Sequence, residues 1–482
     1  MASQARPLRM LFFPLMAPGH MLPALDMAKL FAARGAEVSI ITTPANAAAA
    51  ELSLAAHPSI RLLVLPFPSV AGTALPAGCE NVSSLPSPDI ESAFLAALSA
   101  LEPSFDALLR SLLPDCVVTD MFLPWTCDAA ERLGVPRLVF YGSNFFSQCA
   151  ERSLRLHGTM ESLPPDAASF VVPGLPHRIE MLATQMPSYE TSDPAFAELF
   201  RSITEADAKT YGALMNSFYE LEPDYVRHYR DVLRRRAWHV GPLSLCNKNA
   251  AEKSNRGTNA SSHHHHRHEA YSKWLDARTP GSVVYVSFGS ISFFSAAELR
   301  EIALGLEASG RAFVWVVRNE HHEDWLPEGY EERNEGRGLI VRGWAPQILI
   351  LNHASVGAFL THCGWNSCLE GVAAGLPLVT WPLSADQFYN ERLMVDVLGV
   401  GVAVGAKKYS MKPEERPVVA AEKIASAVGE VMGGGAEAEE RGAKARELAA
   451  AAKRAVEEGG SSYNDVGSLI EELMAKRNAI AT

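Results

Sequence analysis

The chain has 482 residues, of which 48% are hydrophobic and 20% are charged, and its formal net charge at pH 7 is −12. This length exceeds the usual size of one hydrophobic core and predicts two domains of a soluble globular protein. The negative charge argues against nucleic acid or an anionic membrane as the main partner, and no apolar run approaches the roughly 20 residues that a membrane helix requires.

The first half of the chain predicts repeated β-α-β units. A strand over 10–15, a helix over 22–34 that ends at Gly35 and a strand over 37–43 make the first unit. Further strands are expected at 60–65, 116–119 and 137–141, with a helix before the last of them. Because alternating strands and helices are typical of a parallel sheet, we expect an N-terminal α/β domain over 1–246.

Residues 247–270 interrupt this pattern. The stretch is polar, has no periodic apolar face and contains consecutive histidines at 263–266. A segment of this kind cannot bury enough apolar surface to order itself, so we expect a solvated linker between the domains that is dispensable for the chemistry. A metal site formed by the histidines is the alternative.

The second half predicts another α/β array, over 271–460. A strand over 282–288 turns at Gly289 and Ser290 toward a helix over 295–310, and strands follow at 313–317 and 339–341. After about residue 432 the chain is expected to be helical. Two glycines at 459–460 break this region, and an amphipathic helix follows from about 463 to 476.

The stretch 344–387 contains an unusual cluster of polar residues. Its apolar run 355–361 predicts a buried strand, the sequence HCGWNS follows at 362–367, and an amphipathic run continues to Gly375. Asn366 or Ser367 is predicted to cap this helix and Gly375 to end it. The free N–H groups and the dipole of such a helix start bind anions, phosphates above all. An ordinary strand-to-helix turn is the alternative.

His20 and Asp120 follow two predicted strands of the first half. His20 lies in the loop after the first strand, and Asp120 comes directly after the strand at 116–119. The carboxyl ends of parallel strands share one edge of a sheet, where ligands bind. A His–Asp pair there can deprotonate a hydroxyl group, because the imidazole has a suitable pKa and the carboxylate fixes its tautomer. A histidine in such a loop can equally have a purely structural role.

Over its whole length, the segment from Trp344 to Gln387 resembles the donor-binding box of plant UDP-dependent glycosyltransferases of family 1. The stretches PLMAPGHMLP at 14–23 and DMFLPWTCDAAERLGVP at 120–136 are similar to motifs of the family's group with a GHMIP-type N-terminus. The resemblance covers nearly the whole chain. It implies the α/β GT-B fold, in which two Rossmann-like domains face each other across a cleft and a C-terminal helix, here 461–482, crosses back to the N-terminal domain.

The resemblance also implies a UDP-sugar as the donor. Trp344 would stack on uracil, Glu370 would accept from the ribose hydroxyls, and the helix start at Asn366 would stabilise the diphosphate in place of a divalent metal. Gln387, the last residue of the box, favours glucose in the family's pattern. The implied set comprises Trp344, Ala345 and Gln347 at the base or ribose, Glu370 at the ribose, His362, Asn366 and Ser367 at the diphosphate, Trp365, Asp386 and Gln387 at the sugar, and Gly19, Ser290 and Gly364 beside them.

For the reaction, the resemblance implies an inverting O-glucosyl transfer from UDP-glucose, with His20 as the general base and Asp120 as its partner. The acceptor would be a lipophilic plant metabolite, either a flavonoid or other phenolic or a triterpenoid or steroidal aglycone. Two alternatives remain. The enzyme could use another UDP-sugar (xylose, galactose or glucuronate), or the protein could be a non-catalytic nucleotide-sugar binder. The predicted acceptor wall consists of Phe122, Ser143, Asn144, Phe145, Phe146, Met186 and Tyr189.

We further expect a cytoplasmic monomer without a prosthetic group, a bound metal or a stable membrane insertion. The chain has seven cysteines, which are scattered and lack the spacing of metal ligands, so reduced thiols are expected. The apolar N-terminus is interrupted by Pro14 and Pro18 and is not followed by a clean signal-cleavage site.

Overall fold

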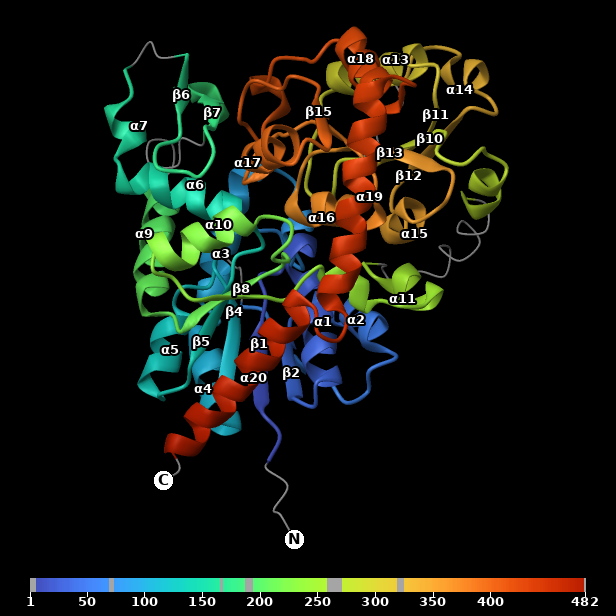
Figure 1. Ribbon diagram of the computed structural model, residues 1–482. Helices are drawn as coiled ribbons and strands as arrows, with labels where there is room; N and C mark the ends of the chain where they lie inside the picture. The colour runs from blue at the N-terminus through green and yellow to red at the C-terminus, as the bar shows by residue number, and fades with distance from the viewer. Residues whose placement is uncertain are drawn as a thin grey trace.

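A computed structural model of the chain describes residues 6–68, 73–164, 168–186, 194–257, 271–318 and 325–480. Figure 1 shows two α/β domains, one above the other, and a C-terminal pair of helices that runs along both. We call the domain built on the first parallel sheet the N-terminal domain and the domain built on the second the C-terminal domain. Each sheet is covered by helices on both faces, which is why its strands are nearly continuous apolar runs.

The N-terminal sheet has seven strands in the order β3-β2-β1-β4-β5-β8-β9, and all of its strand pairs are parallel. The sequence predicted five of these strands and missed the short β8 and β9, which are only four and three residues long. The strands are β1 Arg9–Phe13, β2 Glu37–Thr42, β3 Arg61–Val64, β4 Cys116–Asp120, β5 Arg137–Phe140, β8 Gly212–Met215 and β9 Ala237–His239.

The C-terminal sheet has six parallel strands in the order β12-β11-β10-β13-β14-β15. A separate antiparallel pair, β6 and β7, extends from the N-terminal domain toward the C-terminal one (Figure 1). The strands are β10 Val283–Ser287, β11 Ala312–Val317, β12 Gly338–Arg342, β13 Val356–Thr361, β14 Leu378–Thr380 and β15 Gly401–Ala403, with β6 Ser169–Val171 and β7 Glu180–Leu182.

Helices connect the strands and fill both faces of the two sheets. The helices of the N-terminal half are α1 Pro18–Ala33, α2 Pro44–Leu54, α3 Glu91–Ser99, α4 Glu102–Leu112, α5 Thr126–Arg132, α6 Phe145–Leu156, α7 Thr159–Ser162, α9 Pro194–Lys209, α10 Pro223–Arg227 and α11 Ala250–Asn255. Those of the C-terminal half are α13 Ala296–Ala308, α14 Tyr330–Arg333, α15 Gln347–Leu351, α16 Trp365–Ala374, α17 Gln387–Arg392, α18 Ala421–Met432, α19 Ala436–Val456 and α20 Ser461–Ile480.

Both sheets reverse their strand order once, and the reversals face each other. In the N-terminal sheet the order reverses between β1 and β4, and in the C-terminal sheet between β10 and β13. Ligands of open α/β sheets bind outside the carboxyl ends of the strands at such reversals. The loops after β1 and β4 therefore lie opposite those after β10 and β13, which places the predicted site residues in one region.

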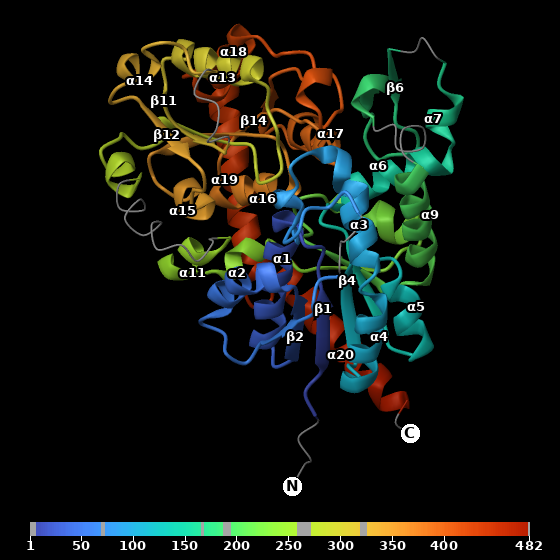
Figure 2. The same cartoon turned by 180° about the vertical axis from the view of Figure 1, so that it is seen from behind.

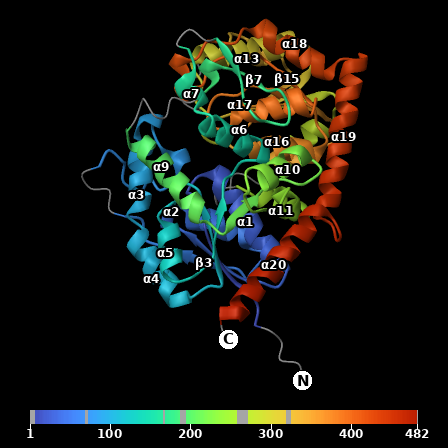
Figure 3. The ribbon, with the colours of Figure 1, turned by 60° about the vertical axis from the view of Figure 1, so that its left-hand side comes forward.

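The C-terminal helices join the domains along one side. α19 packs against α16, and α20 crosses back over the N-terminal domain and ends at its far end (Figures 1 and 3). Val466, Leu469 and Leu473 are at most 1% exposed in the core of the N-terminal domain. Asp465 accepts a 2.7 Å hydrogen bond from Nδ1 of His239, at the end of β9. The predicted α/β fold with two Rossmann-like domains and a returning helix is confirmed.

The described part of the expected linker, residues 247–257, is ordered, so the expectation of a solvated segment is wrong for these residues. That the segment is dispensable for the chemistry stays a prediction. Asn249 and Glu252 form a reciprocal cap at the start of α11, and Asn247 is 1% exposed. Figure 2 shows α11 beside α2 and below α15, between the two domains. The segment is held by polar contacts with buried charges rather than by an apolar face. Such contacts cannot be recognised from the periodicity of apolar residues in the sequence. The histidines at 263–266 lie outside the described residues.

One stretch of the described chain, Pro88–Leu112, is long and apolar enough to cross a membrane by length and composition. The expectation that no apolar run approaches the length of a membrane helix is therefore wrong. The stretch is divided between α3 and α4, and Phe94 and Phe105 are 0% exposed within the N-terminal domain. Core helices pass the same test, so this finding is weak evidence for a membrane span.

The burial of α20 makes its apolar face a test of the fold. Leu469→Ala should lower the free energy of unfolding by about 2–5 kcal/mol, because the deleted atoms leave a cavity in a packed core. Denaturant titration followed by circular dichroism measures this change. Glu471→Ala, at an exposed position of the same helix, should change it by less than about 0.5 kcal/mol. Equal stability of the two variants would contradict the packing of α20 on the N-terminal domain.

Candidate active site

A cavity of about 1010 Å³ lies between the two domains. It is formed by the loops at the carboxyl edges of both sheets, together with Lys253, Arg256 and Gly257. Most of the predicted donor and catalytic residues therefore meet in one place. The predicted residues that line the cavity are Gly19, His20 and Phe122 from the N-terminal domain, and Ser290, Trp344, Ala345, Gln347, His362, Gly364, Trp365, Asn366, Ser367, Glu370, Asp386 and Gln387 from the C-terminal domain.

His20 and Asp120 form a direct pair at the wall of this cavity. His20 lies in the first turn of α1, and its Nδ1 is 2.7 Å from Oδ2 of Asp120, at the end of β4. The side chain of Asp120 is 0% exposed and that of His20 is 20% exposed. The other carboxylate oxygen, Oδ1, accepts from the backbone N–H of Phe122 at 3.1 Å. Asp120 is thus fixed, and it holds the His20 tautomer in which Nδ1 carries the proton and Nε2 is free to accept one.

The surroundings of His20 favour its charged form. Burial alone would lower the pKa of His20, but the charge and hydrogen bond of Asp120, with smaller contributions from Asp386 and Glu91, raise it above its ordinary value. Gly142, at φ +72°, lies against the imidazole, and an added Cβ there would be 3.0 Å from its Cε1. The ring is therefore held tightly in one orientation beside a strong anionic partner.

The helix start predicted after β13 is present, with a different cap. α16 begins at Trp365 and its N-cap is Gly364, while Gly375 ends the helix in the left-handed conformation. Asn366 and Ser367 lie inside the first turn, so the prediction that one of them caps the helix is wrong. The first-turn N–H groups of α16 face the cavity end of the helix, where they and the dipole favour an anion.

His362 lies between two glycines beside this helix start. An added Cβ at Gly289 or at Gly364 would lie 2.5 Å from the imidazole, so only glycine leaves room for the ring at either position. Burial lowers the pKa of His362 to about 4. The imidazole is therefore neutral at physiological pH and can act as a hydrogen-bond donor or acceptor without adding charge.

Trp365 and Asn366 connect the domains directly. The indole N–H of Trp365 donates to the backbone carbonyl of Asn216 at 2.7 Å, and Nδ2 of Asn366 donates to the carbonyl of Gly19 at 2.6 Å. Oδ1 of Asn366 accepts from Nδ2 of Asn216 at 3.2 Å. The polar groups of both side chains thus have partners in the N-terminal domain. The roles expected of Trp365 at the sugar and of Asn366 at the diphosphate stay predictions.

The deep wall of the cavity is built around the carboxylate of Glu370. Its Oε2 accepts from Nε2 of Gln347 at 2.8 Å, and its Oε1 accepts from Arg256 at 2.6 Å. Gln347 also lies 3.2 Å from the hydroxyl of Ser367, and Trp344 lines the cavity beside them. Arg256 was missed by the sequence analysis, because it lies in the segment assigned to an unordered linker.

Asp386 and Gln387 form another wall. Gln387 is fixed by its Oε1, which accepts from the backbone N–H groups of Leu383 and Ser384 at 2.8 and 3.0 Å. Burial raises the pKa of Asp386 to about 6, and among the described residues its buried Oδ2 has no hydrogen-bond partner. Ala385, which precedes it, is at φ +52°. A buried acceptor without a partner next to an unusual backbone conformation is typical of a ligand-binding position.

Only some of the residues predicted for the acceptor wall line the cavity. Phe122 lines the cavity and contacts His20 edge to face, with ring centroids 5.8 Å apart. Phe196 and Phe200 of α9, which the sequence analysis missed, line it too, and Phe200 packs edge to face against Phe122. The predicted wall residues Ser143, Asn144, Phe145, Phe146 and Met186 are not among the residues that line it, and Tyr189 lies outside the described residues.

The predicted wall residues that do not line the cavity are buried or contact other parts of the fold. Phe145 and Phe146 are 0% exposed in the hydrophobic core. Asn144 caps α6, and its Nδ2 donates to Asn390 at 2.7 Å. Met186 packs against the same core and accepts from the hydroxyl of Tyr389. A strand-to-helix loop directs some side chains to the cleft and others to the core, and its sequence does not distinguish them.

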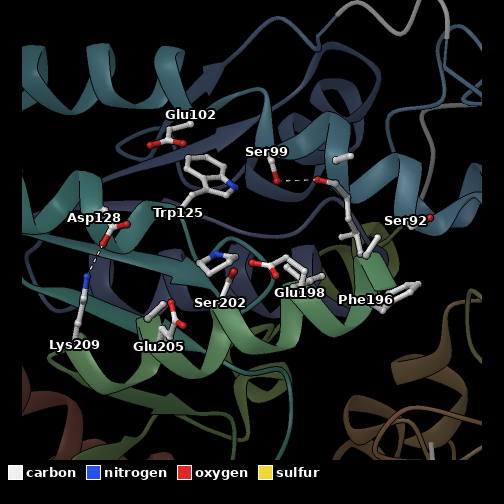
Figure 4. Close-up of a pocket in the computed structure, with 16 residues that line it drawn as sticks. Ser92, Ser99, Glu102, Trp125, Asp128, Phe196, Glu198, Ser202, Glu205 and Lys209 are labelled. Atoms are coloured by element: carbon white, nitrogen blue, oxygen red, sulfur yellow. Dashed lines mark hydrogen bonds and ion pairs between the residues drawn. The ribbon is translucent and has the colours of Figure 1, made fainter. Parts of the chain in front are cut away.

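A smaller cavity of about 420 Å³ lies between α3, α5 and α9. Figure 4 shows the acidic side chains Glu102, Glu198 and Glu205 around it, and the ion pair of Lys209 with Asp128 at one end. It shares only Phe196 with the larger cavity, and none of the predicted site residues lines it. The predicted donor residues and His20 therefore line the larger cavity and not the smaller one.

Comparison with known proteins agrees with this geometry. Residues 115–420 match the family model of "UDP-glucoronosyl and UDP-glucosyl transferase". A scopoletin glucosyltransferase from Nicotiana tabacum is 46% identical over 97% of this chain and 98% of its own length. A UDP-glucose flavonoid 3-O-glucosyltransferase 7 from Fragaria ananassa is 45% identical over 97% of this chain and 96% of its own. The crystal structure of UGT73P12 from Glycyrrhiza uralensis, complexed with glycyrrhetinic acid 3-O-monoglucuronide, matches with a TM-score of 0.91 and 40% identity over 99% of this chain and 97% of that one.

The environment of His20 can be tested without any ligand. Asp120→Asn removes the charge that outweighs burial, so the pKa of His20 should fall below its ordinary value of 6.5. An NMR titration of the imidazole resonances against pH measures this directly. In the same variant His362 should keep its pKa of about 4. A His20 pKa that stays above 6.5 would show that Asp120 does not control this residue.

Proposed function

We propose, because the chain belongs to the UDP-glucoronosyl and UDP-glucosyl transferase family, that it transfers glucose from UDP-glucose to a hydroxyl group of a small lipophilic acceptor. Its GT-B fold and its activity as a UDP-glycosyltransferase follow from its relatives. The observation that carries the finer proposal is the position of His20, which is paired with Asp120 and lines the same cavity as the start of α16.

The base would act through the nitrogen that Asp120 leaves free. His20 Nδ1 is occupied by Asp120, so Nε2 takes the proton of the acceptor hydroxyl as its oxygen attacks the anomeric carbon of glucose. Asp120 then stabilises the imidazolium that forms. A new bond joins the acceptor oxygen to the anomeric carbon, the bond from that carbon to the phosphate oxygen breaks, and UDP leaves with the electron pair. Attack opposite the leaving group inverts the configuration.

The leaving group would be stabilised by α16. UDP gains negative charge as it departs, and the first-turn N–H groups and the dipole of α16 stabilise an anion at that position. Neutral His362 offers a further hydrogen bond. The uracil would stack on Trp344, and Glu370 would accept from the ribose. Fixed Gln387 would bind sugar hydroxyls together with the Asp386 oxygen that has no partner among the described residues. The preference for glucose rests on Gln387 at the last position of the donor box.

The acceptor is proposed to be a phenolic compound. The relatives named for scopoletin and for a flavonoid support this class, and the aromatic wall of Phe122, Phe196 and Phe200 suits a flat ring system. The complex of UGT73P12 with a triterpenoid glucuronide keeps a triterpenoid acceptor as the second candidate. We further propose that the protein acts as a cytoplasmic monomer.

Removal of the proposed base should slow turnover strongly while leaving the donor site intact. His20→Ala should lower the rate of transfer to a phenolic hydroxyl by roughly 10²–10⁴-fold, whereas UDP should bind as it does to the native chain. Initial rates with UDP-glucose and calorimetric binding of UDP separate the two effects. Asp120→Ala should have the same effect to a smaller degree, because the carboxylate orients the base. Turnover near the native rate would rule out His20 as the base.

The nucleotide and sugar ends of the donor site should respond differently to substitution. Trp344→Ala should weaken the binding of UDP itself by about 1–3 kcal/mol, the range for lost base stacking. Gln387→His should instead change the preference among UDP-glucose, UDP-galactose and UDP-xylose while UDP affinity stays nearly constant. Calorimetry with UDP and competition among the UDP-sugars give the two readings. An equal loss of UDP affinity in both variants would contradict this division.

A further inference from the structure

The segment 247–257 reaches both domains through one guanidinium group. Arg256 follows α11, and its side chain is 7% exposed. Its Nε donates to Oδ2 of Asp26 at 2.7 Å, and its Nη1 donates to Oε1 of Glu370 at 2.6 Å. Asp26 lies on α1, the helix whose first turn contains His20, and Glu370 lies on α16. One side chain therefore bonds to both helices that border the cavity.

The N-terminal end of this contact is a buried and closely matched cluster. Asp26 is 0% exposed, and Nδ2 of Asn247 donates to its Oδ1 at 2.9 Å. Lys29 donates to Oδ1 of Asn247 at 2.9 Å and lies 3.4 Å from Asp26. Burial alone would raise the pKa of Asp26, but the charges of Arg256 and Lys29 hold it below its ordinary value. Asp26 is thus an ionised anchor that holds Arg256 in place.

The other end of the contact fixes the carboxylate of Glu370. One oxygen accepts from Arg256, and the other accepts from Gln347 at 2.8 Å. Each carboxylate oxygen has further acceptor capacity, and all three residues line the cavity beside Trp344. An acceptor that is already held in its binding orientation loses less conformational entropy when a ligand hydroxyl arrives. Removing one partner of a buried ion pair also leaves an uncompensated charge.

We propose that Arg256 is a positioning residue of the donor site, which holds Glu370 in the orientation that accepts hydrogen bonds from the ribose hydroxyls of the nucleotide. The inference deepens the proposed function and rests on it. It makes the segment 247–257 a working part of the cleft, because the residue that orients the ribose acceptor comes from this segment and is anchored on α1. Arg256 acts through Glu370 and does not itself touch the reacting atoms.

A comparison of UDP with 2′-deoxy-UDP isolates this role. In the native chain the missing hydroxyl should weaken binding roughly 10–100-fold, the range for a lost hydrogen bond to a charged group. Arg256→Lys keeps the positive charge but cannot bridge Asp26 and Glu370 as a planar fork. It should weaken UDP by a similar factor, leave 2′-deoxy-UDP nearly unchanged and bring the two affinities together. Glu370→Gln should do the same, and the double variant Arg256→Gln with Glu370→Gln should add little further loss.

One control variant separates orientation of the ribose site from general stability. Arg333→Lys alters an arginine that donates to Glu307 outside the cavity, and both nucleotides should bind it as they bind the native chain. If Arg256 has a purely structural role, Arg256→Lys should weaken the binding of UDP and of 2′-deoxy-UDP by the same factor, or should weaken neither. Either result would overturn the inference. Equal binding of the two nucleotides by the native chain would overturn it as well. Failure of the native chain to bind UDP at all would overturn the proposed function itself.

The activity of Arg256→Lys gives an independent reading. A loosely held ribose acceptor weakens donor binding but leaves the base and the helix start of α16 in place. The KM for UDP-glucose should therefore rise by roughly 10-fold or more, while kcat at saturating donor should stay within a few-fold of the native value. A fall in kcat with an unchanged KM would show that Arg256 acts on the chemical step, contrary to the inference.

Discussion

The hydrogen bond from Asn366 to the carbonyl of Gly19, at 2.6 Å, links the two halves of the proposed reaction. Gly19 directly precedes His20, and Asn366 lies in the first turn of α16, so one contact joins the proposed base to the proposed phosphate site. The parallel sheets determine where these loops emerge, but two separate sheets do not fix the distance between them. The bonds of Asn366 and Trp365 across the cleft do, and an aligned base and leaving group depend on that distance.

The cleft uses the same side-chain type in opposite electrostatic states. His20 is paired with buried Asp120, which raises its pKa, whereas His362 is buried between two glycines, and burial lowers its pKa to about 4. The more basic imidazole therefore lies on the N-terminal domain, and a neutral hydrogen-bonding group lies beside α16. Pairs of titratable groups whose environments move their pKa values apart are typical of acid–base sites.

The sequence predicted the features that depend on local patterns. Apolar runs located the long strands, and the polar residues that follow them located both walls of the cavity, because parallel strands share one edge. Contacts between distant segments escaped prediction. Phe145 and Phe122 each follow a strand, yet only Phe122 faces the cavity, since which loop residues turn inward depends on the packing of neighbouring helices. Arg256 was missed because its partners, Asp26 and Glu370, lie far away in the sequence and it has no apolar periodicity.

Donor and acceptor are proposed to meet in the larger cavity, with the acceptor oxygen at His20. The decisive measurement is a crystal structure of the chain with UDP and a phenolic acceptor. We expect uracil against Trp344, phosphates at the start of α16, and a phenolic oxygen within about 3 Å of Nε2 of His20. An acceptor bound instead in the smaller cavity between α3, α5 and α9, or a phenolic oxygen turned away from His20 with UDP in place, would contradict it.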